Sequence, residues 1–193
     1  MVGILSLQGD FEKHKNILDK LEVDSLYVKN KEDLRQTRAL IIPGGESTTL
    51  SMLIDRFAMR DALCDYAKSH SIFGTCAGMI MLSSKIVKKD NNVKALNVMD
   101  FSVSRNSWGS QIDSFEREID LEAFEIRSFN AIFIRAPKVD KIGEGINRIG
   151  YIDEDEAVIL EDGTHMVSSF HPELEEDVRL HEYFLNKFYY GKE

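Results

Sequence analysis

One cysteine lies in a setting that could make it a nucleophile. Cys76 occupies the centre of residues 74–78, Gly-Thr-Cys-Ala-Gly, between the short apolar runs 71–73 and 79–82. A strand, a glycine-flanked cysteine and a helix form the layout of a nucleophile elbow, whose sharp turn lifts one side chain off the sheet. A helix that begins there favours the thiolate, and its first N–H groups are free to bind an oxyanion. The alternative is a buried structural cysteine beside a glycine-rich turn.

A nucleophilic thiol needs a base, and His171 is the best-placed histidine. It follows an apolar stretch and precedes Pro172, which favours extended backbone at His171. Side chains two residues apart in an extended chain share a face, so Glu173 is expected beside the imidazole. There it could orient the ring and stabilise the imidazolium. The alternative is a surface loop, and the tripeptide by itself does not show that His171 meets Cys76.

The remaining histidines and the second cysteine fit structural roles better. His70 and His165 lie in polar loop or turn contexts, and His181 lies on the predicted last helix. His14 recurs with apolar residues on one face of the first predicted helix, so we expect a partly buried residue without a catalytic role. Cys64 lies among apolar residues of another predicted helix and is expected to pack in the core.

The first half of the chain predicts a parallel sheet wound with helices. Predicted strands cover 2–7, 26–28, 39–42 and 71–73, and predicted helices cover 11–21, 50–68 and a stretch from 79. This order requires right-handed crossovers, and ligands of such sheets bind beyond the carboxyl ends of the strands. The turn at residues 43–45, Pro-Gly-Gly, and Cys76 both follow strands at that edge, so we expect them to share one crevice.

The second half of the chain adds predicted strands that follow one another without helices between them. Predicted strands cover 100–105, 114–119, 129–136, 156–160 and 164–170, and a closing helix covers 176–190. The last two strands flank residues 161–163, Glu-Asp-Gly, a hairpin turn signal. The expected fold class is therefore α/β: a three-layer fold with a mostly parallel sheet flanked by helices, plus antiparallel strands in the C-terminal half. No linker or repeat interrupts residues 1–193, so one domain is expected.

Composition excludes several classes of protein. The 193 residues, 43% hydrophobic and 30% charged, suit one globular domain, and the net charge of −9 argues against nucleic acid or an anionic membrane as partner. No apolar run approaches the ~20 residues that span a bilayer. Residues 1–10 read as a strand and not as a signal peptide. Two cysteines form no disulfide framework, and no cluster has zinc spacing, so we expect a cytoplasmic, reduced protein without a metal.

Taken together, three motifs resemble a known class of enzyme. Residues 43–47 (Pro-Gly-Gly-Glu-Ser), 74–78 and 171–173 follow one another at strand ends. In this order they resemble the domain of a class I (triad) glutamine amidotransferase, which implies a flavodoxin-like fold. Three further segments resemble the PdxT family, the glutaminase subunits of pyridoxal 5′-phosphate synthase: residues 7–9, residues 105–106 followed by a glycine and 114–116, and residues 133–137. The resemblance covers nearly the whole chain.

The resemblance assigns roles residue by residue. Cys76 resembles the family nucleophile, and His171 with Glu173 resembles its relay pair. The residues that match the glutamine-binding segments are Gly45, Glu46, Ser47, Arg105, Ile134 and Arg135. For Arg135 a structural ion pair is the alternative. The oxyanion would be held by the backbone N–H groups of Ala77 and Gly45, and a glycine turn can switch between formed and unformed states of such a hole.

One segment departs from the family pattern, and the implied function leaves alternatives open. The family commonly has a small residue and phenylalanine after Arg105-Asn106, where this chain has Ser107-Trp108. The resemblance implies hydrolysis of L-glutamine to glutamate and ammonia, without a cofactor in this chain. The ammonia would pass to a synthase subunit, PdxS, a β/α-barrel that makes pyridoxal 5′-phosphate. The alternatives are another cysteine hydrolase of related fold, such as a peptidase or deglycase, and a regulatory subunit without catalysis.

Overall fold

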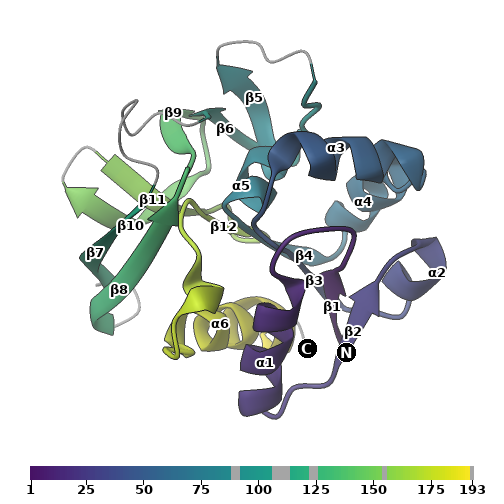
Figure 1. Cartoon of the computed structure of the whole chain (residues 1–193), viewed down its shortest axis with the longest axis horizontal. Coiled ribbons are helices and arrows are strands. Elements are labelled where there is room, and N and C mark those ends of the chain that lie inside the picture. Colours follow the sequence, from purple (N-terminus) through teal and green to yellow (C-terminus); the bar gives the residue numbers. More distant parts are fainter. Residues whose placement is uncertain (88–91, 106–113, 122–125, 154–155, 192–193) are drawn as a thin grey trace.

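A computed structural model describes residues 1–87, 92–105, 114–121, 126–153 and 156–191 (Figure 1). In these residues seven strands form one sheet in the order β10-β11-β12-β4-β3-β1-β2. Its parallel part comprises β1 (Val2–Leu5), β2 (Ser25–Val28), β3 (Ala39–Ile42), β4 (Ser71–Thr75) and β12 (Met166–Ser168). The antiparallel edge comprises β11 (Glu156–Glu161) and β10 (Asn147–Asp153). The mostly parallel sheet and the antiparallel additions confirm the predicted fold class.

Helices cover both faces of the sheet. One face carries α1 (Phe11–Lys20), α6 (Arg179–Phe184) and the π-helix η3 (Leu185–Tyr190), and the other carries α3 (Ser47–Arg56), α4 (Arg60–Ala67) and α5 (Ala77–Leu82). Successive strand residues point to opposite faces. In β3, Ile41 therefore joins the core with Leu18 and Phe184, while Ile42 joins the core with Leu50. Strands buried on both faces explain the continuous apolar runs of the sequence.

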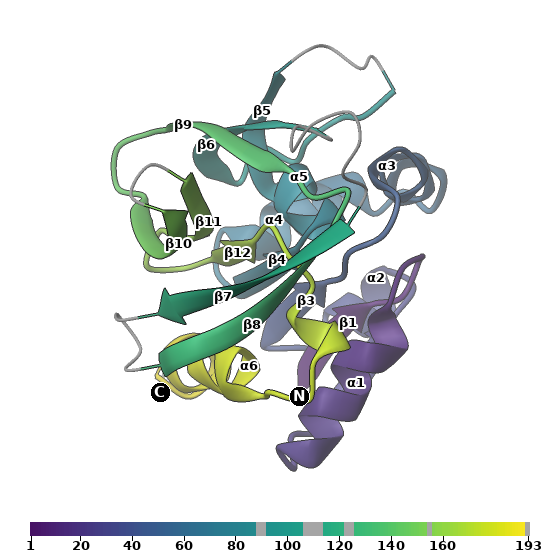
Figure 2. The ribbon, with the colours of Figure 1, turned by 60° about the vertical axis from the view of Figure 1, so that its left-hand side comes forward.

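Two smaller sheets extend the C-terminal half. One has the order β5 (Ser83–Val87), β6 (Met99–Ser104) and β9 (Lys138–Ile142), and the other pairs β7 (Ser114–Leu121) with β8 (Ile126–Ile134) in antiparallel fashion. Figure 2 shows the β7–β8 ribbon beside α6, where Phe129 and Phe133 share a core with Phe184. This ribbon brings the end of β8 to the carboxyl edge of the main sheet.

Several predicted boundaries were wrong. The single helix expected over 50–68 is two helices, because Ala58 has a φ of 52° and turns the chain before the buried Met59. The first strand ends at Leu5, and the closing helix begins at Arg179. Also unpredicted are α2 (Lys31–Leu34), β5, β9 and β10. None of the helices among the described residues is long and apolar enough to cross a membrane.

Candidate active site

The predicted nucleophile elbow is present at the end of β4. Cys76 lies between the last strand residue, Thr75, and the first residue of α5, and its φ of 49° and ψ of −102° are unusual for a residue with a side chain. The residues two positions before and after it must be glycine, since an added Cβ at Gly74 would lie 2.7 Å from the backbone of Gly78, and one at Gly78 would lie 2.1 Å from the carbonyl oxygen of Ile42. Close packing on both sides therefore holds the cysteine in this strained conformation.

The pairing of β4 with β12 explains why the cysteine and the histidine meet. These strands run parallel with Thr75 opposite Ser168, and the N–H of Cys76 donates to the carbonyl of Ser168 at 2.8 Å. His171 follows three residues after Ser168, and its N–H donates to the carbonyl of Ile132 in β8 at 2.9 Å. Both side chains consequently arrive at the same edge of the sheet.

Cys76 and His171 line one cavity of about 240 Å³. The cavity contains all the predicted glutamine-binding residues and two that the sequence did not suggest; its lining is Asp10, Gly45, Glu46, Ser47, Cys76, Ile80, Arg105, Ile134, Arg135 and His171. The glycine turn lies directly above the pair, since a Cβ at Gly44 would meet the His171 ring at 2.3 Å and Cβ of Cys76 at 3.1 Å. The shared crevice expected from the sequence is therefore present.

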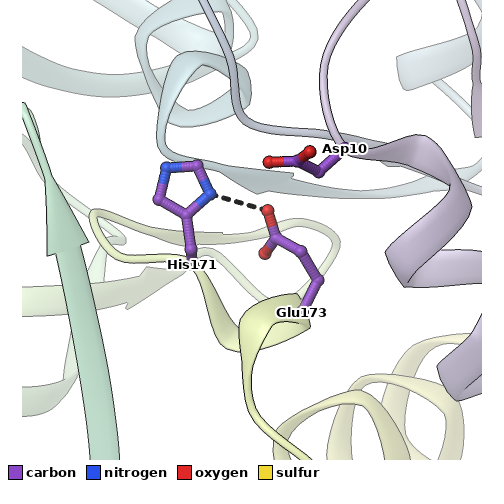
Figure 3. A group of neighbouring side chains, drawn as sticks. All are labelled: Asp10, His171 and Glu173. Atoms are coloured by element: carbon purple, nitrogen blue, oxygen red, sulfur yellow. Dashed lines mark hydrogen bonds and ion pairs between the residues drawn. The ribbon is translucent and has the colours of Figure 1, made fainter.

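Glu173 lies behind the imidazole, away from the cavity. Its Oε1 is 2.7 Å from Nδ1 of His171 (Figure 3), and its side chain is completely buried. The residue belongs to a short 3₁₀ helix, η2 (Pro172–Leu174), which begins immediately after His171. Burial lowers the pKa of His171, but its hydrogen bonds to Cys76 and Glu173 outweigh burial and raise that pKa to about 10. The imidazole is therefore protonated at neutral pH and faces the sulfur as a cation.

Asp10 approaches the same pair from the loop before α1 (Figure 3). Its carboxylate, a ring nitrogen of His171 and the carboxylate of Glu173 lie within 4.8 Å of one another, and these groups are of types that bind metals. Metal binding requires an unprotonated ring nitrogen. Nδ1 of His171 is instead hydrogen-bonded to Glu173, and the raised pKa keeps the ring protonated. The donor set therefore suits an acid–base relay better than a metal centre.

The two predicted oxyanion donors are the backbone N–H groups of Ala77 and Gly45. Neither the N–H of Ala77 nor that of Gly45 donates a hydrogen bond within the described part of the chain. The carbonyl oxygen of Gly44 faces Gly9, where an added Cβ would lie only 1.8 Å from it. In a trans peptide the next N–H points the opposite way, so the N–H of Gly45 is directed away from Gly9. Gly45 has a φ of 140°, a conformation open to glycine.

Glu46 organises the loop that follows this turn. Its carboxylate caps α3 by accepting hydrogen bonds from the N–H groups of Thr48 (2.9 Å) and Thr49 (2.6 Å). Burial raises the pKa of Glu46, but these backbone bonds outweigh it and lower that pKa to about 2. Arg105 reaches the same helix end, with Nη2 3.2 Å from Oγ1 of Thr48. The side chain of Glu46 thus forms part of the pocket wall, and its Oε1 lies 3.5 Å from Nη2 of the Arg105 guanidinium.

We expect Glu46→Ala to lower the free energy of unfolding at pH 7 by ~1 kcal/mol, the typical value of an N-cap on a partly exposed helix end. The folded-state pKa of Glu46 lies below its ordinary value of 4.5, so its contribution is present above pH 4.5 and declines as the pH falls toward 2. Urea unfolding at pH 7 and at pH 3 measures this difference. Exposed Glu144 serves as the control through Glu144→Ala. An equal loss at both pH values would contradict the capping role.

The two predicted residues at the end of β8 have different surroundings. The carbonyl oxygen of Ile134 lies 3.9 Å from Sγ of Cys76. Arg135 is exposed, has a φ of 44° and makes no ion pair with the other described residues. Its position in the cavity lining favours binding over the structural alternative. The departure from the family pattern at Ser107-Trp108 lies outside the described residues.

Sequence reasoning placed some residues correctly and missed others. Cys64 packs against the core, with Sγ 3.5 Å from the carbonyl of Leu96, as predicted. His14 is completely buried, not partly buried, and its Nε2 lies 3.5 Å from Oε2 of Glu173. A histidine on the apolar face of a helix that starts at the ligand-binding edge was the available signal. Nothing in the local sequence marked Asp10 as part of the cavity lining.

Comparisons with known proteins give the family and the fold of this chain. A curated pyridoxal 5′-phosphate synthase subunit PdxT of Thermosipho africanus is 46% identical over 96% of this chain and 97% of its own, and one of Exiguobacterium sibiricum is 42% identical over 97% and 95%. A crystal structure of a glutamine amidotransferase matches with a TM-score of 0.89 and 42% identity over 96% and 97% of the two chains. PurLQS from Thermotoga maritima, at 14% identity and a TM-score of 0.68 over 96% of each chain, shares the fold alone.

The fold, the elbow cysteine and the histidine that faces it define a protein of the glutamine amidotransferase class. The family model that matches residues 4–190 is that of the SNO glutamine amidotransferases. The chain belongs to the SNO glutamine amidotransferase family. The family resemblance derived from the sequence motifs is confirmed.

Proposed function

We propose that this chain is the glutaminase subunit of a pyridoxal 5′-phosphate synthase, hydrolysing L-glutamine to glutamate and ammonia. The observation that carries the proposal is the meeting of Cys76 and the His171–Glu173 pair in one cavity beneath the glycine turn. The relatives named PdxT, which match over nearly their whole length, support the particular role. A cysteine of this kind with a histidine base is the usual arrangement for covalent acyl transfer.

The first chemical step is attack of the Cys76 sulfur on the side-chain amide carbon of glutamine. The His171 cation beside the sulfur and the start of α5 behind it both favour the thiolate. The tetrahedral oxyanion would accept hydrogen bonds from the N–H groups of Ala77 and Gly45. One such donor typically contributes 10²–10³ in rate.

The second step breaks the carbon–nitrogen bond. His171 gives its proton to the departing nitrogen, and ammonia leaves a thioester on Cys76. The imidazole is now neutral and takes a proton from water, which attacks the thioester carbon and releases glutamate. Glu173 accepts the Nδ1–H bond throughout and keeps Nε2 directed at the sulfur. Atoms balance as glutamine plus water giving glutamate plus ammonia.

The charges around the cavity suit an amino acid. Arg105 and Arg135 offer cations to the α-carboxylate, and the carboxylates of Glu46 and Asp10 lie near enough to the same lining to attract the α-ammonium. Gly45 and Ser47 add backbone groups, and Ile134 adds a carbonyl beside the sulfur. A cysteine peptidase or deglycase has no need of this paired arrangement of charge, which favours glutamine over the alternatives.

The fate of the ammonia implies a partner. Ammonia that escapes into neutral water is largely protonated and loses its nucleophilicity. A glutaminase that supplies ammonia for synthesis therefore works beside an ammonia-consuming enzyme that receives the ammonia directly. We propose the synthase subunit PdxS as that enzyme and a cytoplasmic location for the complex.

The proposal is tested by measuring glutamate and ammonia from purified chain with L-glutamine, alone and with the PdxS subunit. We expect stoichiometric release of both products and faster release with the partner. L-Asparagine serves as the matched control substrate, because it is one methylene shorter and cannot bring its amide to Cys76 while its α-groups occupy the same sites. Absence of glutamine hydrolysis in the assembled complex would contradict the proposal and favour a regulatory subunit.

A further inference from the structure

Behind Glu173, on the side away from the cavity, lie two histidines that the mechanism above does not use. His14 of α1 and His181 of α6 are both completely buried, and Nδ1 of His14 lies 2.8 Å from Nε2 of His181. The two helices lie side by side on one face of the sheet (Figure 1). Buried imidazoles in direct contact need a specific protonation pattern, because each ring offers one donor and one acceptor when neutral.

His14 also contacts the catalytic edge of the sheet through its other nitrogen. Nε2 lies 3.5 Å from Oε2 of Glu173 and 3.3 Å from Oγ1 of Thr75. Oε2 is buried and has no hydrogen bond among the described residues, whereas Oε1 is engaged by His171. Oγ1 of Thr75 accepts the N–H of Gly44 at 3.0 Å. His14 therefore stands between the relay carboxylate and the turn above the nucleophile.

The contacts distinguish between the two possible tautomers of the histidine pair. If Nε2 of His14 carries its proton, it faces the negative Oε2 of Glu173, while Nε2–H of His181 donates to Nδ1 of His14. The only unpaired atom in that case is an acceptor, Nδ1 of His181, which has no partner among the described residues. In the opposite tautomer a lone pair of His14 faces the carboxylate, and Nδ1–H of His181 is buried without an acceptor. The first arrangement is favoured for two reasons: it directs an N–H of His14 at the carboxylate, and it leaves no buried N–H without an acceptor.

We propose that His14, oriented by His181, is a positioning residue that donates its Nε2–H toward Oε2 of Glu173 and so holds the carboxylate against His171. This inference rests on the function proposed above. It describes a series of polar contacts from His181 through His14 and Glu173 to His171, in which the step from His14 to Glu173 is the 3.5 Å approach of Nε2 to Oε2. Through Thr75 the same imidazole is tied to the glycine turn.

Neutral histidines suit this task. Burial, and after it the neighbouring His181 and His171, lower the pKa of His14 well below its ordinary value, and burial lowers that of His181 to about 3. Among the described residues, His171 and Asp10 are charged groups that approach Glu173, with Asp10 within 4.8 Å. A neutral donor orients Glu173 without neutralising its charge, so the carboxylate continues to stabilise the His171 cation.

The experiment compares His14→Phe, which keeps an aromatic ring but removes the donor, with His14→Gln, whose amide can present an N–H near the position of Nε2. His70→Gln, at a partly exposed histidine stacked on Tyr66, is the matched control. The readouts are ring ¹⁵N and ¹H NMR of the histidines across pH, and kcat and KM for glutamine in the complex with the synthase.

In the wild type we expect the ring spectra to show His14 protonated at Nε2 and His171 titrating well above its ordinary pKa. In His14→Phe we expect the pKa of His171 to fall by ~1 unit or more, because Glu173 is no longer held in the orientation that stabilises the His171 cation. We expect kcat to fall roughly 10- to 100-fold with KM nearly unchanged. His14→Gln should restore most of both quantities, which a merely structural role would not explain.

The inference is overturned if His14→Phe folds and leaves the His171 titration and kcat as in the wild type. It is also overturned, without any variant, if the wild-type spectra show Nε2 of His14 unprotonated, so the test survives a variant that does not fold. If His171 titrates at its ordinary value in the wild type and glutamine hydrolysis does not depend on Cys76, the proposed function itself fails. If the pKa of His171 is raised in the wild type and His14→Phe leaves that pKa unaltered, the positioning role of His14 is refuted and the proposed function is not.

Discussion

Cys76→Ala is expected to abolish release of glutamate and ammonia, with a loss of roughly 10⁴-fold or more. The sulfur is the only nucleophile that the elbow presents to the cavity, and no thioester can form without it. Alanine keeps the Cβ that packs against Gly44, so the fold and the assembly with the synthase should be retained. Glutamate formation in the complex measures the loss, and thermal unfolding confirms that the variant is folded.

Cys64→Ala is the matched control for this variant. Cys64 is half-buried on α4 and packs beside Leu96, so its loss should cost little activity. Retained glutamine hydrolysis in Cys76→Ala at a rate near that of the wild type would show that the elbow cysteine is not the nucleophile.

His171→Asn is expected to reduce kcat/KM by roughly 10²–10⁴, the range in which a positioned acid–base group contributes. Asparagine fits beneath Gly44 and can keep a bond to Glu173, but it supplies no cation to the sulfur and no proton to the departing ammonia. The wild-type enzyme needs His171 protonated, so its rate should decline as the pH rises toward the pKa of about 10. Rate against pH, measured for both proteins, should show this alkaline decline only in the wild type.

His70→Asn is the control, because His70 stacks on Tyr66 and makes its hydrogen bond to Ser69. Thioester formation at the normal rate in His171→Asn would mean that another group activates the sulfur.

Local chemistry made part of the site predictable from the sequence. The small residues around Cys76 indicated the elbow, because that constraint acts between nearby residues. Glu173 does lie beside His171, but residues 172–174 form a 3₁₀ helix and not the extended chain from which that neighbourhood was predicted. The carboxyl-edge rule correctly placed the glycine turn and the cysteine in one crevice. The contact between Cys76 and His171 was beyond local reasoning, since it depends on β12 pairing with β4, a choice of neighbour made by the whole sheet.

Other features were not predicted from the sequence because they depend on contacts between residues that are far apart along the chain. Strands β9 and β10 carry many polar residues at sheet edges, so their apolar pattern is weak. The sequence did not show that Glu46, which lines the cavity, also caps α3 with its side chain. His14 contacts Glu173 only because η2 folds back against α1. The helix break at Ala58 reflects the burial of Met59, which a periodic pattern does not show.

The most direct test of the account treats the complex of this chain and its synthase with a glutamine-analogue electrophile and locates the adduct by peptide mass spectrometry. We predict a single adduct on Cys76, slowed by added L-glutamine, much slower in His171→Asn, and absent from Cys64. Labelling that spares Cys76, or that proceeds equally fast in His171→Asn and in the presence of saturating glutamine, would contradict the meeting of these two side chains as a catalytic pair.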